Sequence, residues 1–384
     1  MNKPFYQLKQ PYDIIRQFTP NWFTMTMGTG VVALILPEFA PDHALLWQSA
    51  GYLWQFNTLL FVLFTLLYIL RWVIYPHEAK QIFKHPSMAL FLGAIPMGLA
   101  TLLNGFLKFG LVLYGEIALT IAQYLWYLDV ILAVLIGIAV PFCMFSRQQH
   151  QLGQMTAMWL LPIVACEVAA SSGGLLLQHL PVDQHSIMIL IGSYVLWGMS
   201  VLPAFAVLTI LMLRLALHQL PSKELAMSSW LALGPIGTGA LALLLLGEQA
   251  HPLMAAYGLS DLGVVMQQIG IFSSFILLGF GLWWLSIALL TTLSHVKNNL
   301  SFNLGWWALT FPLGVFCLAI FQLAAQTHLD FIAQIATVFA GSLVLLWSVV
   351  MLKTLQGIYR GHLFFSPCLK SFLEQEQQAI HVPK

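Results

Sequence analysis

The stretch FNLGWWALTFPLGVF, residues 302–316, decides how this chain folds. It opens a hydrophobic segment with Trp306 and Trp307, where aromatic residues of a membrane interface would lie. Pro312 lacks an N–H and clashes with the carbonyl four residues back, so a helix must bend or loosen there. In hydrocarbon, loosened backbone is tolerated only against neighbouring helices or a water-filled cavity. Phe311 is therefore a bulky ring at the weak point of a helix that faces something other than lipid, and a kinked, packed helix is the plainer interpretation.

The composition places the chain among polytopic membrane proteins. It has 384 residues, of which 59% are hydrophobic and 8% are charged, whereas a soluble domain carries about 25% charged residues. The cysteines stand apart from one another and from any histidine cluster, so neither a disulfide framework nor a metal site is expected. They are Cys143, Cys166, Cys317 and Cys368.

Ten segments are long and apolar enough to span a membrane, which takes about 20 residues. They are predicted at 20–37, 50–74, 87–106, 117–145, 156–178, 186–216, 228–249, 263–293, 304–325 and 331–357. Residues 1–19 are predicted to be a cytoplasmic N-terminus, 20–357 a single transmembrane domain and 358–384 a polar, peripheral C-terminal tail on the cytoplasmic side. The predicted fold class is an all-α integral membrane protein.

The positive charges are distributed very unevenly between the two sides of this arrangement. With ten spans, fourteen of the fifteen lysines and arginines fall on the side of the termini, and only Lys108 falls on the other. The positive-inside rule then places both termini in the cytoplasm of a bacterial-type inner membrane.

The odd-numbered segments share an interruption at similar depth, which we interpret as an internal repeat. Four of them carry a proline, at Pro96, Pro162, Pro235 and Pro312, each followed closely by small residues. The first segment carries Gly28 and Gly30 at the same depth instead. Five broken helices that alternate with five straight ones would place five weak points around one axis. A central pathway is the expected product.

The odd-numbered segments offer neutral donors to a solute on that axis. These are Thr24, Thr26, Thr29, Thr101, Asn104, Ser171, Ser172, Thr238 and Thr310. No lysine or arginine is expected deep in these segments. Hydroxyls would hold an anion weakly, which suits rapid passage. The alternative for each serine or threonine is a hydrogen bond to a carbonyl of its own helix.

Two acidic residues, Asp129 and Glu167, lie inside predicted spans. A charge in hydrocarbon is costly, so such groups are functional candidates. Glu167 shares a helix face with Ser171 and is a candidate for proton coupling. A hydrogen-bonded structural role is the alternative, and it is favoured more strongly for Asp129.

Motifs of other chemistries are not found in the sequence. There is no P-loop, H-E-x-x-H or G-x-S-x-G pattern. The twelve histidines are mostly in predicted loops and are interpreted as solvated, including His77, His85, His150, His251 and His295. We expect no enzymatic activity, no cofactor and no nucleic-acid partner.

The sequence resembles the tellurite-resistance/dicarboxylate transporter family, also called the voltage-dependent anion channel family. That family includes bacterial tellurite-resistance membrane proteins, yeast malate permeases and sulfite pumps, and plant guard-cell slow anion channels. The resemblance is carried by NWFTMTMGTGVVALIL at 21–36, by the proline-centred third, fifth and seventh segments, and by 302–316. It covers about residues 18–359.

The resemblance implies five helical hairpins around a quasi-five-fold central pore, and a homotrimer with one pore in each subunit. It also implies that a phenylalanine of the ninth helix plugs the pore. The matching position is Phe311, with Phe316 one turn later as the alternative.

Three functions follow as hypotheses. The first is an anion channel or uniporter for small anions such as malate-like C4-dicarboxylates, sulfite, halide or a tellurite-type oxyanion. The second is a proton-coupled dicarboxylate transporter that uses Glu167. The third is a membrane scaffold or sensor that transports nothing.

Overall fold

The computed structural model describes residues 4–8, 10, 12–41, 43–296 and 300–381. These residues form helices joined by short connections, with no β-strand among them. In this part of the chain, ten helical segments are long and apolar enough to cross a membrane, which confirms the predicted fold class and number of spans. They are Pro20–Phe39, Ala44–Ile74, Ala89–Tyr114, Glu116–Arg147, Ala157–Leu177, Gln184–His218, Ala226–Ala255, Ser260–Val296, Leu304–Thr327 and Asp330–Arg360.

Burial alternates from one span to the next. In the odd-numbered spans, 78–100% of the most apolar window is buried within the protein, against 22–33% in the even-numbered spans. The odd-numbered spans are therefore surrounded by protein, while the even-numbered spans turn one side outward. Their outward side chains are large and apolar, as at Leu59, Phe145 and Leu345, which are 71%, 82% and 71% exposed. Such a surface suits contact with lipid tails.

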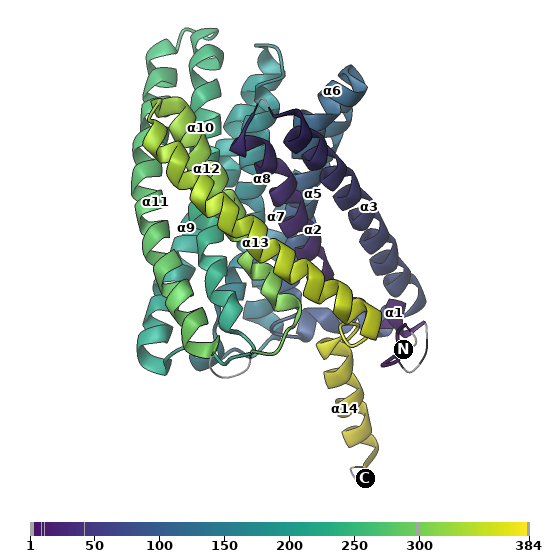
Figure 1. Cartoon of the computed structure of the whole chain (residues 1–384). Coiled ribbons are helices and arrows are strands. Elements are labelled where there is room, and N and C mark those ends of the chain that lie inside the picture. Colours follow the sequence, from purple (N-terminus) through teal and green to yellow (C-terminus); the bar gives the residue numbers. More distant parts are fainter. Residues whose placement is uncertain (1–3, 9, 11, 42, 297–299, 382–384) are drawn as a thin grey trace.

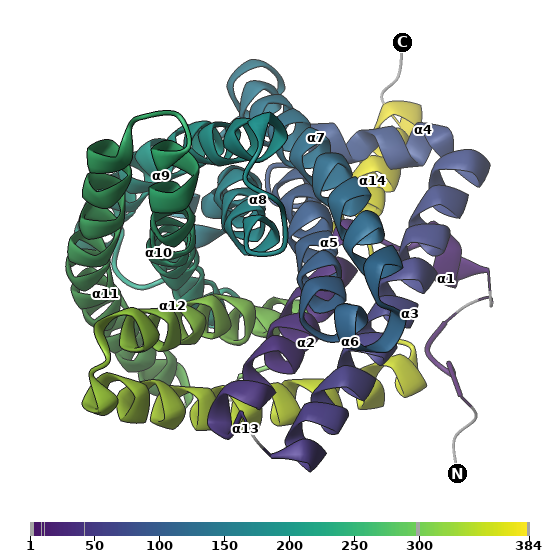
Figure 2. The ribbon, with the colours of Figure 1, turned by 90° about the horizontal axis from the view of Figure 1, so that it is seen from above.

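The inner helices form a closed ring (Figure 2). Around it, α2 packs on α5, α5 on α8, α8 on α10, α10 on α12, and α12 on α2 again. Their bounds are Phe23–Ile35 for α2, Ala94–Gly105 for α5, Leu161–Leu177 for α8, Leu233–Ala255 for α10 and Phe311–Thr327 for α12.

Each inner helix packs against the long outer helix that follows it in the chain. The outer helices are α3 (Ala44–Ile74), α7 (Glu116–Arg147), α9 (Gln184–His218), α11 (Ser260–Val296) and α13 (Asp330–Arg360). Figure 2 shows them outside the ring of inner helices. Whether the axis of the ring is a pore stays a prediction.

Every inner span begins as a tight 3-10 helix and continues as an α-helix. The 3-10 segments are η1 (Pro20–Trp22), η4 (Ala89–Gly93), η7 (Ala157–Leu160), η8 (Ala226–Ala232) and η9 (Leu304–Leu309). The change of helix type falls where the sequence places its prolines.

The four repeat prolines occupy the second or third residue of the α-helical part. Pro162 and Pro312 are the second residues of α8 and α12, and Pro96 and Pro235 are the third residues of α5 and α10. The first turn of an α-helix has no internal acceptor for its N–H groups, so proline removes no hydrogen bond there. The prolines therefore mark the junction of the two helix types rather than a bend within the α-helix.

The third span departs from its predicted end. It runs to Tyr114 instead of residue 106, because the helix continues through a π-helical turn, η5 (Phe106–Gly110), into α6 (Leu111–Tyr114). Lys108 lies within that turn. The prediction that Lys108 follows the end of the third span is therefore wrong, because this residue is part of a helical turn within that span.

The start of the C-terminal tail is packed against the body of the protein. The Arg71 guanidinium, 1% exposed, donates to the Phe18 carbonyl and to the Ser366 hydroxyl at 3.2 Å. Leu363 and Cys368 are 7% and 2% exposed. The tail is therefore not peripheral along this stretch, and both termini lie at the same end of the molecule (Figure 1). The remaining short helices are α1 (Asp13–Arg16), η2 (Leu36–Phe39), α4 (Pro76–Ala79), η3 (Lys80–Lys84), η6 (Leu152–Gln154) and α14 (Pro367–His381).

Candidate functional site

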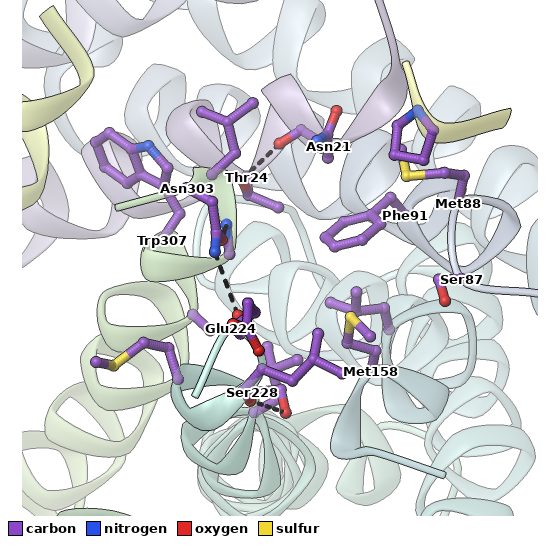
Figure 3. Close-up of a pocket in the computed structure, with 18 of the residues that line it drawn as sticks. Asn21, Thr24, Ser87, Met88, Phe91, Met158, Glu224, Ser228, Asn303 and Trp307 are labelled. Carbon is purple, nitrogen blue, oxygen red and sulfur yellow. Dashed lines mark hydrogen bonds between the residues drawn. The ribbon is translucent and has the colours of Figure 1, made fainter. Parts of the chain in front are cut away.

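A cavity of about 510 Å3 lies at the N-terminal ends of the inner helices; we call it the entry cavity (Figure 3). All five 3-10 segments contribute to its wall, as does the C-terminal segment through His362, Leu363, Phe365 and Pro367. Its polar side chains are Asn21, Thr24, His85, Ser87, Glu224, Ser228, Asn303 and His362.

No lysine or arginine is among the described residues that line the entry cavity. Positive potential there comes from the backbone instead, because each helix N-terminus carries about half a positive charge from its unpaired N–H groups. Five such ends surround the cavity. One acidic residue, Glu224, lies on the wall. Its backbone surroundings lower the pKa of the carboxyl, so it is ionised at neutral pH.

His85 caps the third span from the wall of the entry cavity. Its Nδ1 accepts hydrogen bonds from the backbone N–H groups of Ser87 and Met88, at 3.2 and 3.1 Å. An accepting Nδ1 carries no proton, so the neutral ring holds its proton on Nε2. Burial also lowers the pKa of His85, which favours the neutral form. His85 was predicted to be a solvated loop residue; instead it is a half-buried, neutral N–H donor beside the cavity.

Several hydroxyl and amide groups of the wall are held by local hydrogen bonds. Thr24 donates to the Asn21 carbonyl at 2.6 Å, and Ser228 donates to a carbonyl of its own 3-10 turn at 2.7 Å. The Asn303 amide donates to the Glu224 carbonyl at 3.2 Å across two connections (Figure 3). These bonds fix the side chains on the wall, and each hydroxyl oxygen keeps acceptor capacity.

The floor of the entry cavity narrows into a space of about 20 Å3, which we call the neck. All five inner spans contribute to it, and every lining residue is apolar. They are Met27, Met97, Leu160, Leu161, Val164, Leu231, Gly234, Phe311 and Pro312. A water molecule occupies about 30 Å3 of liquid and needs a void of at least about 10–15 Å3. The neck therefore has room for about one water molecule.

The two phenylalanines of the ninth span differ in position. Phe311 is 3% exposed and lines both the entry cavity and the neck. Phe316 is fully buried against α10, α11 and α13, where its ring lies 6.2 Å from that of Phe339 and against Gly237 and Gly281. Of these two residues, only Phe311 is among those that line the entry cavity and the neck.

A second cavity of about 420 Å3 lies on the C-terminal side of the neck, between the inner helices; we call it the exit cavity. On α10, Gly234 at the neck and Leu241 at the exit cavity are about two helical turns apart. The exit cavity is again lined from all five inner spans. Its polar side chains are Glu38, Asn104, Lys108, Ser171, Gln178, His179 and Gln322.

Four of the predicted pathway residues form helix–helix contacts. A Cβ on Gly28 would lie 2.1 Å from the Thr310 Oγ1 and 2.7 Å from the Trp307 ring, so α2 and the ninth span touch there. A Cβ on Gly30 would lie 2.1 Å from the Thr101 Oγ1. The Thr310 and Thr101 hydroxyls donate to carbonyls of their own helices, at 2.7 and 2.8 Å. The structure shows these residues in helix packing, and their role on a pathway stays a prediction.

The other predicted hydroxyl positions divide among three environments. Thr29 is fully buried and accepts from the Trp347 Nε1 of outer helix α13 at 3.2 Å, so it faces away from the axis. Thr24 lines the entry cavity and Ser171 the exit cavity. Thr238 lies on α10 between the levels of the neck and the exit cavity. It is fully buried, and its hydroxyl has no hydrogen-bond partner within the described part of the chain.

Glu167 is fully buried on α8 but is not among the residues that line either cavity or the neck. It lies near Gly239 of α10 and the hydroxyl of Ser200 on α9. That hydroxyl donates to the Ile163 carbonyl at 2.9 Å, so neither carboxylate oxygen has a hydrogen-bond partner among the described residues. Asp129 on α7 is also fully buried, and neither of its carboxylate oxygens has a hydrogen-bond partner among the described residues.

Most polar residues of the two cavities were not predicted from the sequence, and His85 and Lys108 are two examples. His85 lies two residues before Ser87 and close to the start of a span, which is the place for a capping side chain, although histidine is not among the usual N-cap residues. Lys108 sits in FLKFG, where the charge and the glycines read as a loop. Nothing in that pattern distinguishes a loop from a π-helical turn.

Comparison with known proteins gives a consistent result. The family model described as voltage-dependent anion channel matches residues 17–355. A sulfite efflux pump of Arthroderma benhamiae is 36% identical over 352 residues, covering 91% of this chain and 93% of the relative. An uncharacterized transporter of Methanocaldococcus jannaschii is 30% identical over 353 residues, covering 92% and 96%. A malic acid transport protein of Schizosaccharomyces pombe is 21% identical over 305 residues, covering 78% and 68%.

Proposed function

Because the chain belongs to the voltage-dependent anion channel family, a family of anion transporters, we propose that small anions pass along the axis of its inner ring as through a channel or uniporter. One observation carries the proposal: the entry cavity, the neck and the exit cavity are each lined from all five inner spans. Because the three spaces are lined by the same five spans, we infer that they lie on one axis. The ring closes within a single chain, so the pathway needs no second subunit.

Phe311 is the proposed gate. Its ring lines both the entry cavity and the neck, which has room for about one water molecule. A hydrophobic constriction of this size excludes water and ions until a side chain moves. The anion passes when the Phe311 ring rotates or yields.

Sulfite is the first proposed substrate, because relatives that cover more than nine-tenths of this chain are named sulfite efflux pumps. Malate-like dicarboxylates follow, on the more distant malic acid transport protein. The proposal that halide and tellurite-type oxyanions are substrates depends on the resemblance in sequence alone. The entry cavity suits all of these, since helix N-termini and neutral donors attract an anion without holding it tightly.

We place the protein in a bacterial-type inner membrane with both termini in the cytoplasm. The distribution of lysine and arginine supports this orientation, as does the position of both termini at one end of the molecule (Figure 1). An inside-negative potential, about 2.3 kcal/mol per charge per 100 mV, then drives anions outward. A homotrimer with one pathway in each subunit is proposed from the family resemblance.

A proton-coupled carrier is the second candidate function. The observation in its favour is Glu167, whose fully buried carboxyl group has no hydrogen-bond partner among the described residues. A group of this kind inside a membrane is a candidate proton site. Its place between α8, α9 and α10, away from the residues that line the cavities, supports the passive mechanism instead.

Sulfite efflux from liposomes that contain the purified protein tests the proposal. A channel or uniporter releases sulfite down its electrochemical gradient and continues after an ionophore collapses the proton gradient. A proton-coupled carrier stops under that treatment, and Glu167→Gln stops it as well. Absence of flux for sulfite, malate and chloride alike would support the scaffold hypothesis and overturn transport.

A further inference from the structure

The exit cavity contains an ion pair between Lys108 and Glu38. The Lys108 ammonium donates to the Glu38 carboxylate and to the Leu34 carbonyl, the latter at 3.1 Å. The two side chains are 26% and 31% exposed, and both line the cavity. An ammonium group has three donors, and these two partners account for two of them. The pair is therefore held in place yet open to a solute in the cavity.

The backbone places Lys108 there by an unusual turn. Lys108 lies in the π-helical segment η5, one turn beyond Asn104 of α5, and both residues line the exit cavity. Single π-helical turns within α-helices occur frequently at functional sites, because the extra residue redirects the side chains around it. Here the turn lies within the third span and contains Lys108, the one lysine or arginine of that span.

The electrostatics of the exit cavity require a cation if anions leave through it. The C-terminal ends of α2, α8 and α12 lie near the cavity, and each carries about half a negative charge, whereas the third span continues through η5 and α10 continues to Ala255. Glu38 adds a full negative charge, and Glu248 lies nearby, accepting from the Gln322 amide at 2.8 Å. Lys108 is the one lysine or arginine among the described residues of the wall. An anion that emerges from the neck meets these negative charges, and this ammonium group carries the one opposing full charge among the described residues of the wall.

A further polar atom beside Lys108 lacks a partner. The amide oxygen of Asn104 is buried and has no hydrogen-bond donor among the described residues. Because this oxygen is buried, a solute in the cavity reaches it only after the Asn104 amide group rotates, and the O–H of a singly protonated oxyanion such as hydrogen sulfite then supplies the missing donor. The cation and the free acceptor together match the two ends of that ligand class.

Resting on the proposed function, we propose that Lys108 and Asn104 form an anion-release subsite in which Glu38 competes with the departing anion. The anion displaces the Glu38 carboxylate from the ammonium group. The Glu38 carboxylate then binds the ammonium group again, and the anion is released into water. Lys108 sets how readily the anion enters the cavity, and Glu38 sets how quickly it leaves.

The two partners make opposite predictions for the kinetics of sulfite flux. In Lys108→Gln the Glu38 charge is left to repel the anion, and the half-saturating sulfite concentration is expected to rise about tenfold, from the loss of one charge contact in a partly exposed site. In Glu38→Gln the ammonium group is free to hold the anion. The half-saturating concentration and the maximal rate are then both expected to fall, by a similar factor.

The experiment measures sulfite flux in liposomes and equilibrium sulfite binding to the purified protein, for the wild type and both variants. Lys370→Gln is the matched control, because Lys370 pairs with Glu374 on the exposed helix α14 and its loss should change neither readout. The double variant Lys108→Gln/Glu38→Gln, which leaves no unpaired charge, keeps the test valid if Lys108→Gln folds poorly. Its half-saturating concentration is expected between those of the single variants.

The outcomes separate the subsite from the function. A purely structural ion pair would shift both single variants in the same direction, and that result overturns the subsite, as does wild-type kinetics in both. Binding that depends on Lys108 without any flux would retain the subsite and overturn the proposed function. Absence of both binding and flux in the wild type would overturn both.

Discussion

Replacement of Phe311 by alanine gives the sharpest test of the proposed gate. The ring is 3% exposed and stands in a neck of about 20 Å3. To open the wild-type neck, the ring must leave this packed position, and exposing a buried phenylalanine costs about 1.5–3 kcal/mol. That range corresponds to a factor of about ten to a hundred in rate. Phe311→Ala removes this cost, so sulfite flux should rise by about ten- to a hundredfold.

Phe316→Ala is the matched control for this prediction. It makes the same chemical change on the same helix, at a ring that packs against Phe339 rather than on the axis. Loss of a buried phenylalanine costs about 3–5 kcal/mol of stability. Both variants should therefore unfold at a lower temperature, while only Phe311→Ala gains flux. The assay is sulfite release from liposomes, normalised to folded protein, with anion current across a planar bilayer as a second readout.

Two results would refute the reasoning about the gate. If Phe311→Ala conducts no more than the wild type, the ring does not limit passage. If Phe311→Ala and Phe316→Ala gain flux equally, the increase reflects general loosening of α12 rather than removal of a gate. A gain without anion selectivity in the reversal potential would point to a nonspecific leak.

Three further predictions concern the entry side. Burial lowers the pKa of His85 below the ordinary value of about 6.5, so the unfolded chain binds a proton that the folded chain does not. The stability of the wild type should therefore fall as the pH drops below about 6.5. Thermal unfolding measured between about pH 8 and pH 5 should show a smaller loss of stability for His85→Asn than for the wild type. Glu224→Gln removes a negative charge from the wall of the entry cavity and should raise sulfite flux at low ionic strength. This increase should disappear near 1 M salt, because the Debye length there is about 3 Å and the charge is screened. Gly28→Ala places a Cβ 2.1 Å from the Thr310 Oγ1 and should lower the free energy of unfolding by about 1–3 kcal/mol. Gly192→Ala is the control, because a Cβ there meets nothing within 4 Å. Chemical denaturation measures the free energy of unfolding of both variants.

The spans and their alternation could be predicted from the sequence because both depend on composition over many residues. Twenty apolar residues can hardly be anything other than a membrane span, and prolines in alternate spans distinguish one set of helices from the other. The structure confirms ten spans. Where a single charged residue interrupts a span, composition fails, as at Lys108, because a π-helical turn leaves no pattern in the sequence.

The direction in which individual side chains point could not be predicted from the sequence. Gly28 and Thr310 seemed to be two separate pathway residues, but they are one contact between neighbouring helices. Every face of an inner helix meets protein, so apolar periodicity does not reveal which face lies toward the axis. In an amphipathic helix of a soluble protein, the polar face would have shown the direction. Only the packing of five helices together determines that Thr24 lines a cavity while Thr29 contacts an outer helix.

On the proposed function, the structure also indicates where selectivity among anions arises. The neck is lined by apolar side chains from all five spans, so it offers no hydrogen bonds with which to recognise an oxyanion. An anion must lose part of its hydration shell to pass the neck. Among anions of similar size, the one with the lowest free energy of dehydration therefore passes fastest. Selectivity then depends on the width of the neck, set by Met27, Met97 and Phe311, more than on any polar contact. Relatives named for sulfite and for malic acid can therefore share this architecture, since a change of neck side chains alters the permitted size without altering the cavities on either side.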